Sequence, residues 1–364
     1  MRNIMKVWPV ILNKLESKNV DESYFFDFSD KKGEACALEI SNGKCQFIEG
    51  EPKKYSVKII VESKDWIAIL SKDLLIKDAI TQGKLKIEGE DQTLEKFESY
   101  FSGDPEGTQV KIDNYAITEN EKELLEGKWT KPKKVLGLIG SPRKNQGVTA
   151  MIYSIFKQGL VECGCEIDTV YLADLENNSC KGCFTCWYGK NKKCVHKGDV
   201  NDLILKMHTY DLLVLAAPVY VDGLPGALKN LIDRMLCQLD PQFILKDGHC
   251  RHPSRYPKMP HLVLLSTCGF TEMDNFTPMI EHIKEICKNM HLTYIGEVLP
   301  PTAWMMTISN LKEIYISVFE AIKQAGIEII TSGKISEELS KQITKQIFSR
   351  GQIFSVHNRD SLKE

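Results

Sequence analysis

Lys133-Lys-Val-Leu-Gly-Leu-Ile-Gly-Ser-Pro-Arg-Lys-Asn-Gln-Gly-Val-Thr149 is the stretch that decides the fold of the residues that follow it. It opens with an apolar run, Val135 to Ile139, of the kind that a buried parallel strand carries. The run stops at Gly140-Ser141-Pro142, and apolar residues recur at helical spacing from Val148 onward. A strand, a short turn and a helix in this order direct backbone N–H groups and a helix N-terminus at a phosphate.

Side chains of the same turn add donors and charge. Ser141 and Thr149 contribute hydroxyls, and Arg143 and Lys144 contribute positive charge that can neutralise a phosphate. The turn is not a Walker loop, because no Gly-Lys-Ser/Thr follows, and it lacks the Gly-x-Gly-x-x-Gly dinucleotide fingerprint. The alternative is an ordinary capped turn between a strand and a helix.

From residue 133 onward, strand and helix patterns alternate. Strands are expected at 135–139, 166–172, 211–217, 261–267 and within 292–299, and helices fit 200–209, 228–239, 275–289 and 310–324. This alternation predicts an α/β fold with a doubly wound five-stranded parallel sheet. In such sheets ligands bind beyond the carboxyl ends of the strands, so the loops after Ile139, Ala217 and Thr267 should converge.

These three loops resemble the flavin loops of flavodoxin-like NAD(P)H-dependent FMN reductases. The first is Gly140 to Asn145 closed by Thr149, the second runs from Pro218 to Lys229, and the third is Ser266-Thr-Cys-Gly-Phe270. The resemblance implies that the first loop holds the phosphate of FMN and that the other two lie along the isoalloxazine ring. The residues implied to bind FMN are Ser141, Arg143, Lys144, Asn145, Thr149, Pro218, Val219, Tyr220, Thr267, Cys268, Gly269 and Phe270.

A cysteine-rich insertion lies between the second strand and the next helix. Cys180, Cys183, Cys186 and Cys194 are separated by two, two and seven residues. Four thiolates with this compact spacing suit an iron–sulfur cluster better than zinc, whose structural sites use two separated Cys-x-x-Cys pairs. The segment resembles iron–sulfur flavoproteins, in which this loop binds a [4Fe–4S] cluster beside FMN. Zinc, or free thiols that only pack the loop, remain the alternatives.

The first hundred residues have a different pattern. Strand-like segments at 24–28, 35–40, 44–48, 56–61 and 84–88 are combined with helical pieces, and Ser41-Asn42-Gly43 predicts a hairpin turn. Residues 1–103 are therefore expected to form a smaller α+β domain. Its segments Tyr55 to Val61, Trp66 to Leu70 and Gly83 to Gly89 resemble the sterol-carrier-protein family. In that family a tunnel holds lipid; the residues that could line one here, or simply form core, are Ile67, Leu70, Leu74, Leu75 and Ile80. A docking or dimerisation module is the alternative to lipid binding.

The remaining boundaries follow from composition. Residues 104–132 are predicted to be a linker, 133–330 the flavodoxin-like FMN-binding domain, and 331–364 a C-terminal extension. Within the extension we expect a helix at 336–348 and a strand-like segment at 352–356.

Composition narrows the functional class. The chain has 364 residues, 43% hydrophobic and 26% charged, as expected of a soluble globular protein. A net charge of −2 gives no electrostatic reason to expect a nucleic acid or anionic membrane as partner. No apolar run is long enough for a membrane span, and the N-terminus does not resemble a signal peptide. Twelve cysteines in this context indicate reduced thiols or metal ligands and a cytoplasmic location.

The sequence thus predicts an FMN-dependent oxidoreductase that takes hydride from NAD(P)H and passes electrons to a small-molecule or protein acceptor. The flavin carries the chemistry, so no side chain is assigned as catalytic. The alternative is an iron–sulfur flavoprotein electron carrier without NAD(P)H dehydrogenase activity of its own. A homo-oligomer is compatible with either function.

Overall fold

The computed structural model describes residues 1–6, 8–10, 12, 17–31, 34–71, 73–89, 96–97, 99–101 and 129–361. The chain divides into two compact units, residues 1–111 and 112–364, and each is described here by itself. The predicted linker, 104–132, lies outside the described residues as far as residue 128.

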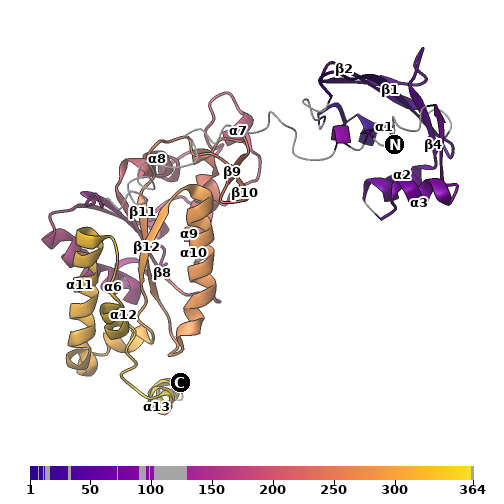
Figure 1. Cartoon of the computed structure of the whole chain (residues 1–364). Coiled ribbons are helices and arrows are strands. Elements are labelled where there is room, and N and C mark those ends of the chain that lie inside the picture. The colour runs from indigo at the N-terminus through magenta and orange to yellow at the C-terminus, as the bar shows by residue number, and fades with distance from the viewer. Residues whose placement is uncertain are drawn as a thin grey trace. The chain divides into compact units, whose positions relative to one another are not determined.

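The first unit is built on a mixed five-stranded sheet (Figure 1). Its strands are β1 (Asp21–Phe28), β2 (Cys36–Ser41), β3 (Lys44–Glu49), β4 (Val57–Val61) and β5 (Leu85–Gly89), in the order β3-β2-β1-β4-β5. Only the β1–β4 pair is parallel. The predicted hairpin turn between β2 and β3 is confirmed, with both Asn42 and Gly43 at positive φ.

Helices and aromatic rings fill one face of this sheet. The unit begins with α1 (Arg2–Met5) and a 3₁₀ turn, η1 (Trp8–Val10), and carries α2 (Ser63–Leu70) and α3 (Ile76–Thr81) between β4 and β5. Trp66 and Ile69 of α2 are buried, since residues three apart share one face of a helix. Three of the five apolar residues predicted to line a tunnel or core are instead exposed: Ile67, Leu75 and Ile80.

The second unit contains the predicted five-stranded sheet, and it is parallel throughout. Its strands are β6 (Lys134–Ile139), β7 (Glu166–Tyr171), β8 (Leu212–Pro218), β11 (His261–Thr267) and β12 (Thr293–Val298). The order β12-β11-β8-β6-β7 places the first strand between the second and the third, which is the flavodoxin-like order. Every residue of β8 and β11 is buried, which explains why both read as continuous apolar runs.

Helices cover both faces of this sheet (Figure 1). On one side lie α6 (Val148–Glu162) and α11 (Ile316–Ser332); on the other lie α8 (Asp199–Lys206), α9 (Gly226–Arg234) and α10 (Thr277–Met290). The helix expected at 310–324 starts later than predicted, because residues 309–315 form a 3₁₀ segment. Gly159 of α6 and Gly326 of α11 allow the two helices to approach closely.

Short elements connect the main ones. They are η2 (Lys144–Gln146), η3 (Leu172–Asp174), α7 (Thr185–Tyr188), η4 (Met207–Thr209), η5 (Met235–Gln238), the hairpin of β9 (Ile244–Lys246) and β10 (His249–Arg251), η6 (Met273–Phe276), η7 (Ala303–Thr307) and η8 (Ser309–Tyr315).

The C-terminal extension is helical. It comprises α12 (Glu337–Ile343) and α13 (Arg350–Ser361), and Ile343 and Ile353 are buried in the same core as α6 and α11. The strand-like prediction for 352–356 was therefore wrong. A strand needs a neighbouring strand for its backbone hydrogen bonds, whereas a helix satisfies them within its own segment.

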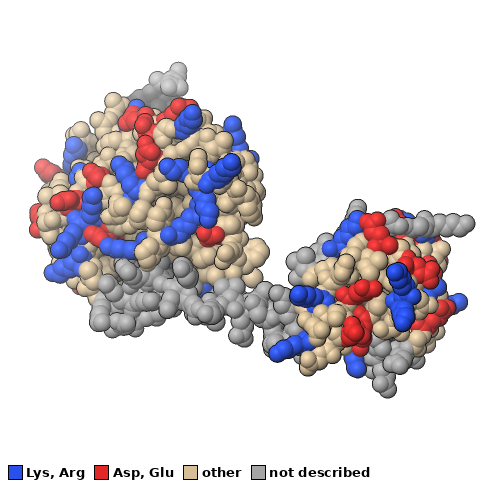
Figure 2. Space-filling model, turned by 90° about the horizontal axis from the view of Figure 1, so that it is seen from above, with Lys and Arg blue, Asp and Glu red and all other residues tan. Residues whose placement is uncertain are grey.

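Charged side chains of both signs are interspersed over the faces of the two units that Figure 2 shows. Within the described residues, no helix is long and apolar enough to cross a membrane.

Candidate functional site

The first loop forms a tight cradle at the end of β6. Ser141 and Thr149 are 1% and 2% exposed, so their hydroxyls belong to the interior of the loop rather than to the surface. The backbone N–H of Arg143 donates a hydrogen bond to Ser141 Oγ at 3.4 Å. At Gly147 a Cβ atom would lie 2.9 Å from Ser141 Oγ, so the cradle closes only with glycine there. A concave loop of N–H and O–H donors is well suited to a phosphate.

The charged residues of this loop differ in their surroundings. Arg143 and Asn145 are exposed, and Lys144 adopts a left-handed backbone conformation with φ 52°. The Lys144 ammonium forms an ion pair with Asp174, which follows β7. Because this pair already offsets the charge of Lys144, Arg143 is the better placed of the two to neutralise a phosphate.

The second loop leaves β8 through a strained turn. The Tyr220 N–H donates to the Gly223 carbonyl at 3.0 Å, and the Gly223 N–H donates to the Tyr220 carbonyl at 3.1 Å. Between them, Val221 and Asp222 both have positive φ, 47° and 59°. A non-glycine residue in this region costs about 1 kcal/mol or more, and such strain gathers at functional sites. The turn presents the Tyr220 ring, 43% exposed, at the sheet edge.

The third loop continues β11. Thr267 and Cys268 are buried, whereas Gly269 and Phe270 are exposed. The pKa of the Cys268 thiol is raised, chiefly by burial, which keeps the thiol protonated. A protonated thiol is a poor nucleophile.

A fourth segment, not predicted from the sequence, supports the third loop. Residues 302–304 follow β12 and pack under the loop. The Thr302 N–H donates to the Phe270 carbonyl at 2.9 Å, and Trp304 Nε1 donates to the Gly269 carbonyl at 3.0 Å. The Pro-Pro pair that precedes Thr302 marks the end of β12, and it is the sequence feature that could have indicated a further loop at this edge of the sheet.

Hydrogen bonds join the three loops at one edge of the sheet. The hydroxyls of Thr149 and Thr267 lie 2.8 Å apart, which connects the first loop to the third. The Val219 N–H donates to the Thr267 carbonyl at 2.9 Å, which connects the second to the third. Below them, Ser266 Oγ donates to the Ala217 carbonyl at 2.9 Å. The convergence expected from a doubly wound sheet is therefore present.

The four predicted cluster ligands lie on the loop after β7. Cys180 and Cys183 are exposed, Cys186 and Cys194 are half-buried, and all four carry free thiols. Burial, and then the negative charge that Cys194 and Cys180 would carry as thiolates, raise the pKa of Cys186. A hydrogen bond from the Thr185 hydroxyl lowers the pKa of Cys183. Over the described part of the chain, no three metal-ligating side chains are gathered into one group.

Helix α9 holds the entry of the cysteine loop. Asn230 Nδ2 donates to the Asn177 carbonyl at 3.1 Å, and Ser179 Oγ donates to Asn230 Oδ1 at 3.1 Å. The His196 ring lies 2.9 Å from the Ser179 carbonyl, which joins the exit of the loop to its entry. Since α9 contains the last residues of the second loop, the second loop and the entry of the cysteine loop share one support.

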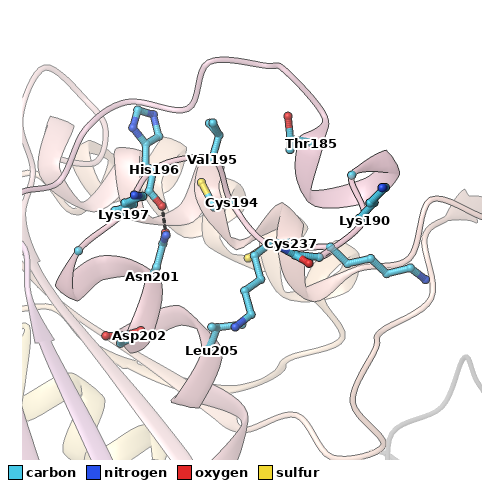
Figure 3. Close-up of a pocket in the computed structure, with 15 residues that line it drawn as sticks. Thr185, Lys190, Cys194, Val195, His196, Lys197, Asn201, Asp202, Leu205 and Cys237 are labelled. Atoms are coloured by element: carbon cyan, nitrogen blue, oxygen red, sulfur yellow. Dashed lines mark hydrogen bonds between the residues drawn. The ribbon is translucent and has the colours of Figure 1, made fainter.

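A pocket of about 500 Å³ lies against the exit of the cysteine loop (Figure 3). Cys194 and Cys237 both line it, and Asn201 donates to the His196 carbonyl on its wall. Cys237, at the end of η5, is only 4% exposed, and burial followed by Cys186 and Cys194 raises its pKa to about 12. No ligand spacing in the sequence links Cys237 to the other four cysteines, so only the structure brings it to this pocket.

Known protein families match a part of each of the two units. The NADPH-dependent FMN reductase family model matches residues 133–248, and the SCP-2 sterol transfer family model matches residues 12–102. An iron–sulfur flavoprotein of Methanosarcina thermophila is 35% identical over 114 residues, which are 31% of this chain and 58% of that protein. Another, from Methanocaldococcus jannaschii, is 38% identical over 101 residues, 28% of this chain and 51% of that protein. The chain spans about half the length of the curated relatives it matches.

Among solved structures, an FMN-dependent NADH-azoreductase from Bacillus anthracis in complex with FMN aligns with 55% of this chain and 100% of its own, at 11% identity and a TM-score of 0.42. The sterol-transfer match covers the strands of the first sheet, and the FMN reductase match covers β6, β7 and β8 of the second. Residues 133–248 therefore form an NADPH-dependent FMN reductase domain homologous to iron–sulfur flavoproteins, and residues 12–102 form a domain of the SCP-2 sterol transfer family.

Proposed function

We propose that this protein is an FMN-dependent oxidoreductase that takes hydride from NADH or NADPH and passes the electrons to a separate acceptor. The observation that carries the proposal is the junction of three loops at the carboxyl edge of the parallel sheet, held by the Thr149–Thr267 hydrogen bond. The match to the FMN reductase family over residues 133–248 supports the identity of the cofactor.

In this proposal the first loop holds the FMN phosphate. The buried hydroxyls of Ser141 and Thr149 donate hydrogen bonds, Arg143 supplies positive charge, and Lys144 and Asn145 complete the loop. The cradle at Gly147, which a side chain would fill, is the structural feature that fits a phosphate.

The second and third loops orient the flavin ring. Pro218, Val219 and Tyr220 lie along one part of the ring, and Thr267, Cys268, Gly269 and Phe270 along another. Bound FMN supplies the redox chemistry, accepting two electrons as hydride and releasing them singly or in pairs. The protein's own residues bind and orient the flavin, and the exposed rings of Tyr220 and Phe270 shield it from water.

We further propose that Cys180, Cys183, Cys186 and Cys194 hold a [4Fe–4S] cluster. The donor set of four thiols suits iron, and the identity of 32–38% to five iron–sulfur flavoproteins supports it. In this case the cysteine loop gathers its thiols around the metal, since ligand sites of this kind commonly form as the metal binds. A flavin-bearing electron carrier without dehydrogenase activity is the second candidate function, and the same homology favours it.

One experiment separates the two functions. The full chain is purified anaerobically, loaded with FMN, and mixed with NADH or NADPH in the presence and absence of a quinone or ferricyanide acceptor. The proposal expects catalytic oxidation of at least one nicotinamide cofactor with acceptor present. If the bound flavin is reduced by dithionite but by neither nicotinamide cofactor, the electron-carrier function replaces it.

A further inference from the structure

A segment beyond the matched residues 133–248 packs against the cysteine loop. After β10 the chain returns along η5, where Leu239 and Ser254 form an antiparallel bridge. The Asp240 N–H donates to the Pro253 carbonyl at 2.9 Å, and the Arg255 N–H donates to the Gln238 carbonyl at 2.9 Å. The backbone of Arg255 is therefore held at a defined position beside the loop.

The Arg255 guanidinium binds three separate pieces of backbone. Its Nη2 donates to the Cys186 carbonyl at 3.0 Å, and its Nη1 donates to the carbonyls of Lys192 at 3.0 Å and Cys237 at 2.9 Å. Its Nε lies 3.9 Å from the Asp240 carboxylate. The side chain is only 14% exposed, so water competes little for the bonds to Cys186 and Cys237, whereas the bond to Lys192 is exposed.

The three carbonyls belong to the parts of the chain that carry thiols. Cys186 closes the compact triplet, Lys192 lies two residues before Cys194, and Cys237 lies on the wall of the pocket that Cys194 also lines (Figure 3). One planar guanidinium thus fixes the part of the loop at Cys186 and the part at Lys192 relative to each other and to Cys237 of η5. It also places a permanent positive charge beside thiols that carry negative charge once they bind metal.

We propose that Arg255 is the positioning residue of the cysteine site: it holds the backbone at Cys186, Lys192 and Cys237 so that the loop can close around a cluster, and its charge stabilises the reduced cluster. The electrostatic role rests on the proposed [4Fe–4S] cluster. The positioning of the backbone by Arg255 is a property of the protein without metal.

The test compares Arg255→Gln and Arg255→Lys with wild type, all as the full chain. Gln removes the charge and most donors, whereas Lys keeps the charge but cannot bridge three carbonyls with a planar fork. Arg251→Lys is the matched control, because Arg251 lies in the same segment between η5 and β11 and donates to Asn289 instead of to the cysteine loop. FMN content and circular dichroism verify that each variant is folded.

The first measurement uses metal-free protein, so it does not depend on the cluster. The rate at which iodoacetamide alkylates Cys237 is followed by mass spectrometry of its peptide. Both Arg255 variants should be alkylated about tenfold faster or more than wild type, as expected when one or two net hydrogen bonds that resist local opening are lost. The Arg251→Lys rate should equal that of wild type. Equal alkylation rates in wild type and folded Arg255→Gln would overturn the positioning role.

The second measurement is made after anaerobic reconstitution. Arg255→Gln should bind less iron and sulfide, and its remaining cluster should have a more negative reduction potential than wild type, since a nearby positive charge favours the reduced form. Arg255→Lys should lose iron while keeping a potential close to that of wild type. An unchanged potential in Arg255→Gln overturns the electrostatic role. If wild type itself binds no iron, the cluster is rejected, and alkylation still decides the positioning role.

Discussion

The hydroxyls of Thr149 and Thr267 lie 2.8 Å apart, although 118 residues separate them in the sequence. Thr149 stands in the first turn of α6, and Thr267 is the last residue of β11. Both side chains are buried, so the bond is protected from water. It joins the loop proposed to hold a phosphate to a loop proposed to contact the flavin ring, which makes FMN binding a property of the assembled sheet edge.

The double variant Ser141→Val, Thr149→Val should bind FMN at least about 100-fold more weakly, because each hydrogen bond to a charged group contributes roughly 1.5–3 kcal/mol. Quenching of flavin fluorescence on titration with apoprotein measures the affinity. Thr293→Val is the control: Thr293 lies at the amino end of β12, its hydroxyl has no hydrogen-bond partner among the residues that the structure describes, and FMN affinity should not change. An unaltered FMN affinity in the folded double variant would reject this site.

Cys183→Ser and Cys194→Ser, each prepared anaerobically, should lose nearly all iron and sulfide and retain FMN, since each removes one ligand of four. Iron and sulfide analysis with an absorption spectrum measures the loss. Cys250→Ser changes an exposed cysteine of β10 and should leave the iron content intact. Wild-type protein that holds flavin but takes up no iron under reconstitution would exclude the cluster.

Gly326→Ala should destabilise the second unit by about 1–3 kcal/mol, the usual cost of overpacking. A Cβ atom at Gly326 would lie 2.5 Å from the Phe156 carbonyl oxygen of α6, and backbone cannot move aside as a side chain can. Urea unfolding measures the change. Gly351→Ala places its methyl group in open space and should be neutral or slightly stabilising. Equal stability of wild type and Gly326→Ala would contradict the close packing of α6 and α11.

Asp211 should make the stability of the second unit depend on acid pH. Burial alone would raise its pKa, but hydrogen bonds from Lys258 and from the N–H groups of Lys134 and Lys133 outweigh burial, and the pKa is lowered from 3.8. A lowered folded-state pKa means that the ionised carboxylate contributes stability above 3.8 and loses it as the pH falls through the folded value.

Asp211→Asn should therefore melt below wild type at pH 7, and the difference should shrink as the pH falls below about 4. Melting temperatures measured across this range by circular dichroism test the expectation. A difference in melting temperature that stays constant from pH 7 to acid would show that the charge of Asp211 is not responsible.

The first unit should not be stabilised by a long-chain acyl ligand. Its interior is occupied by contiguous aromatic side chains: the Phe26 and Trp66 rings are 5.0 Å apart, and the Tyr24 and Phe97 rings 4.7 Å. A ligand that binds only the folded state raises the melting temperature, so a thermal shift with palmitoyl-CoA or cholesterol sulfate is informative. A saturable rise of several degrees would instead demonstrate a lipid site and contradict the filled interior.

Local sequence patterns predicted the sheet of the second unit because a strand that is buried on both faces has a continuous run of apolar residues. The continuous apolar runs of β8 and β11 identify them as central strands, and the short Gly/Ser/Pro turn after β6 predicts a phosphate loop before any tertiary contact is known. The convergence of the three loops then follows from the topology of parallel strands. Patterns of this kind are weaker at 352–356, which were expected to be strand-like and lie in α13 instead.

Other features were decided only by the tertiary structure. Contacts between segments remote in sequence determine three features of the site. They are the position of the Arg255 guanidinium, the place of Cys237 beside the cysteine loop, and the hydrogen bond by which Thr302 supports the third loop. Such contacts carry no periodicity, since each needs one side chain at one point of the folded chain. Periodic burial produces a periodic pattern of apolar residues, which can be recognised in the sequence. These single hydrogen bonds form only in the folded chain and produce no such pattern.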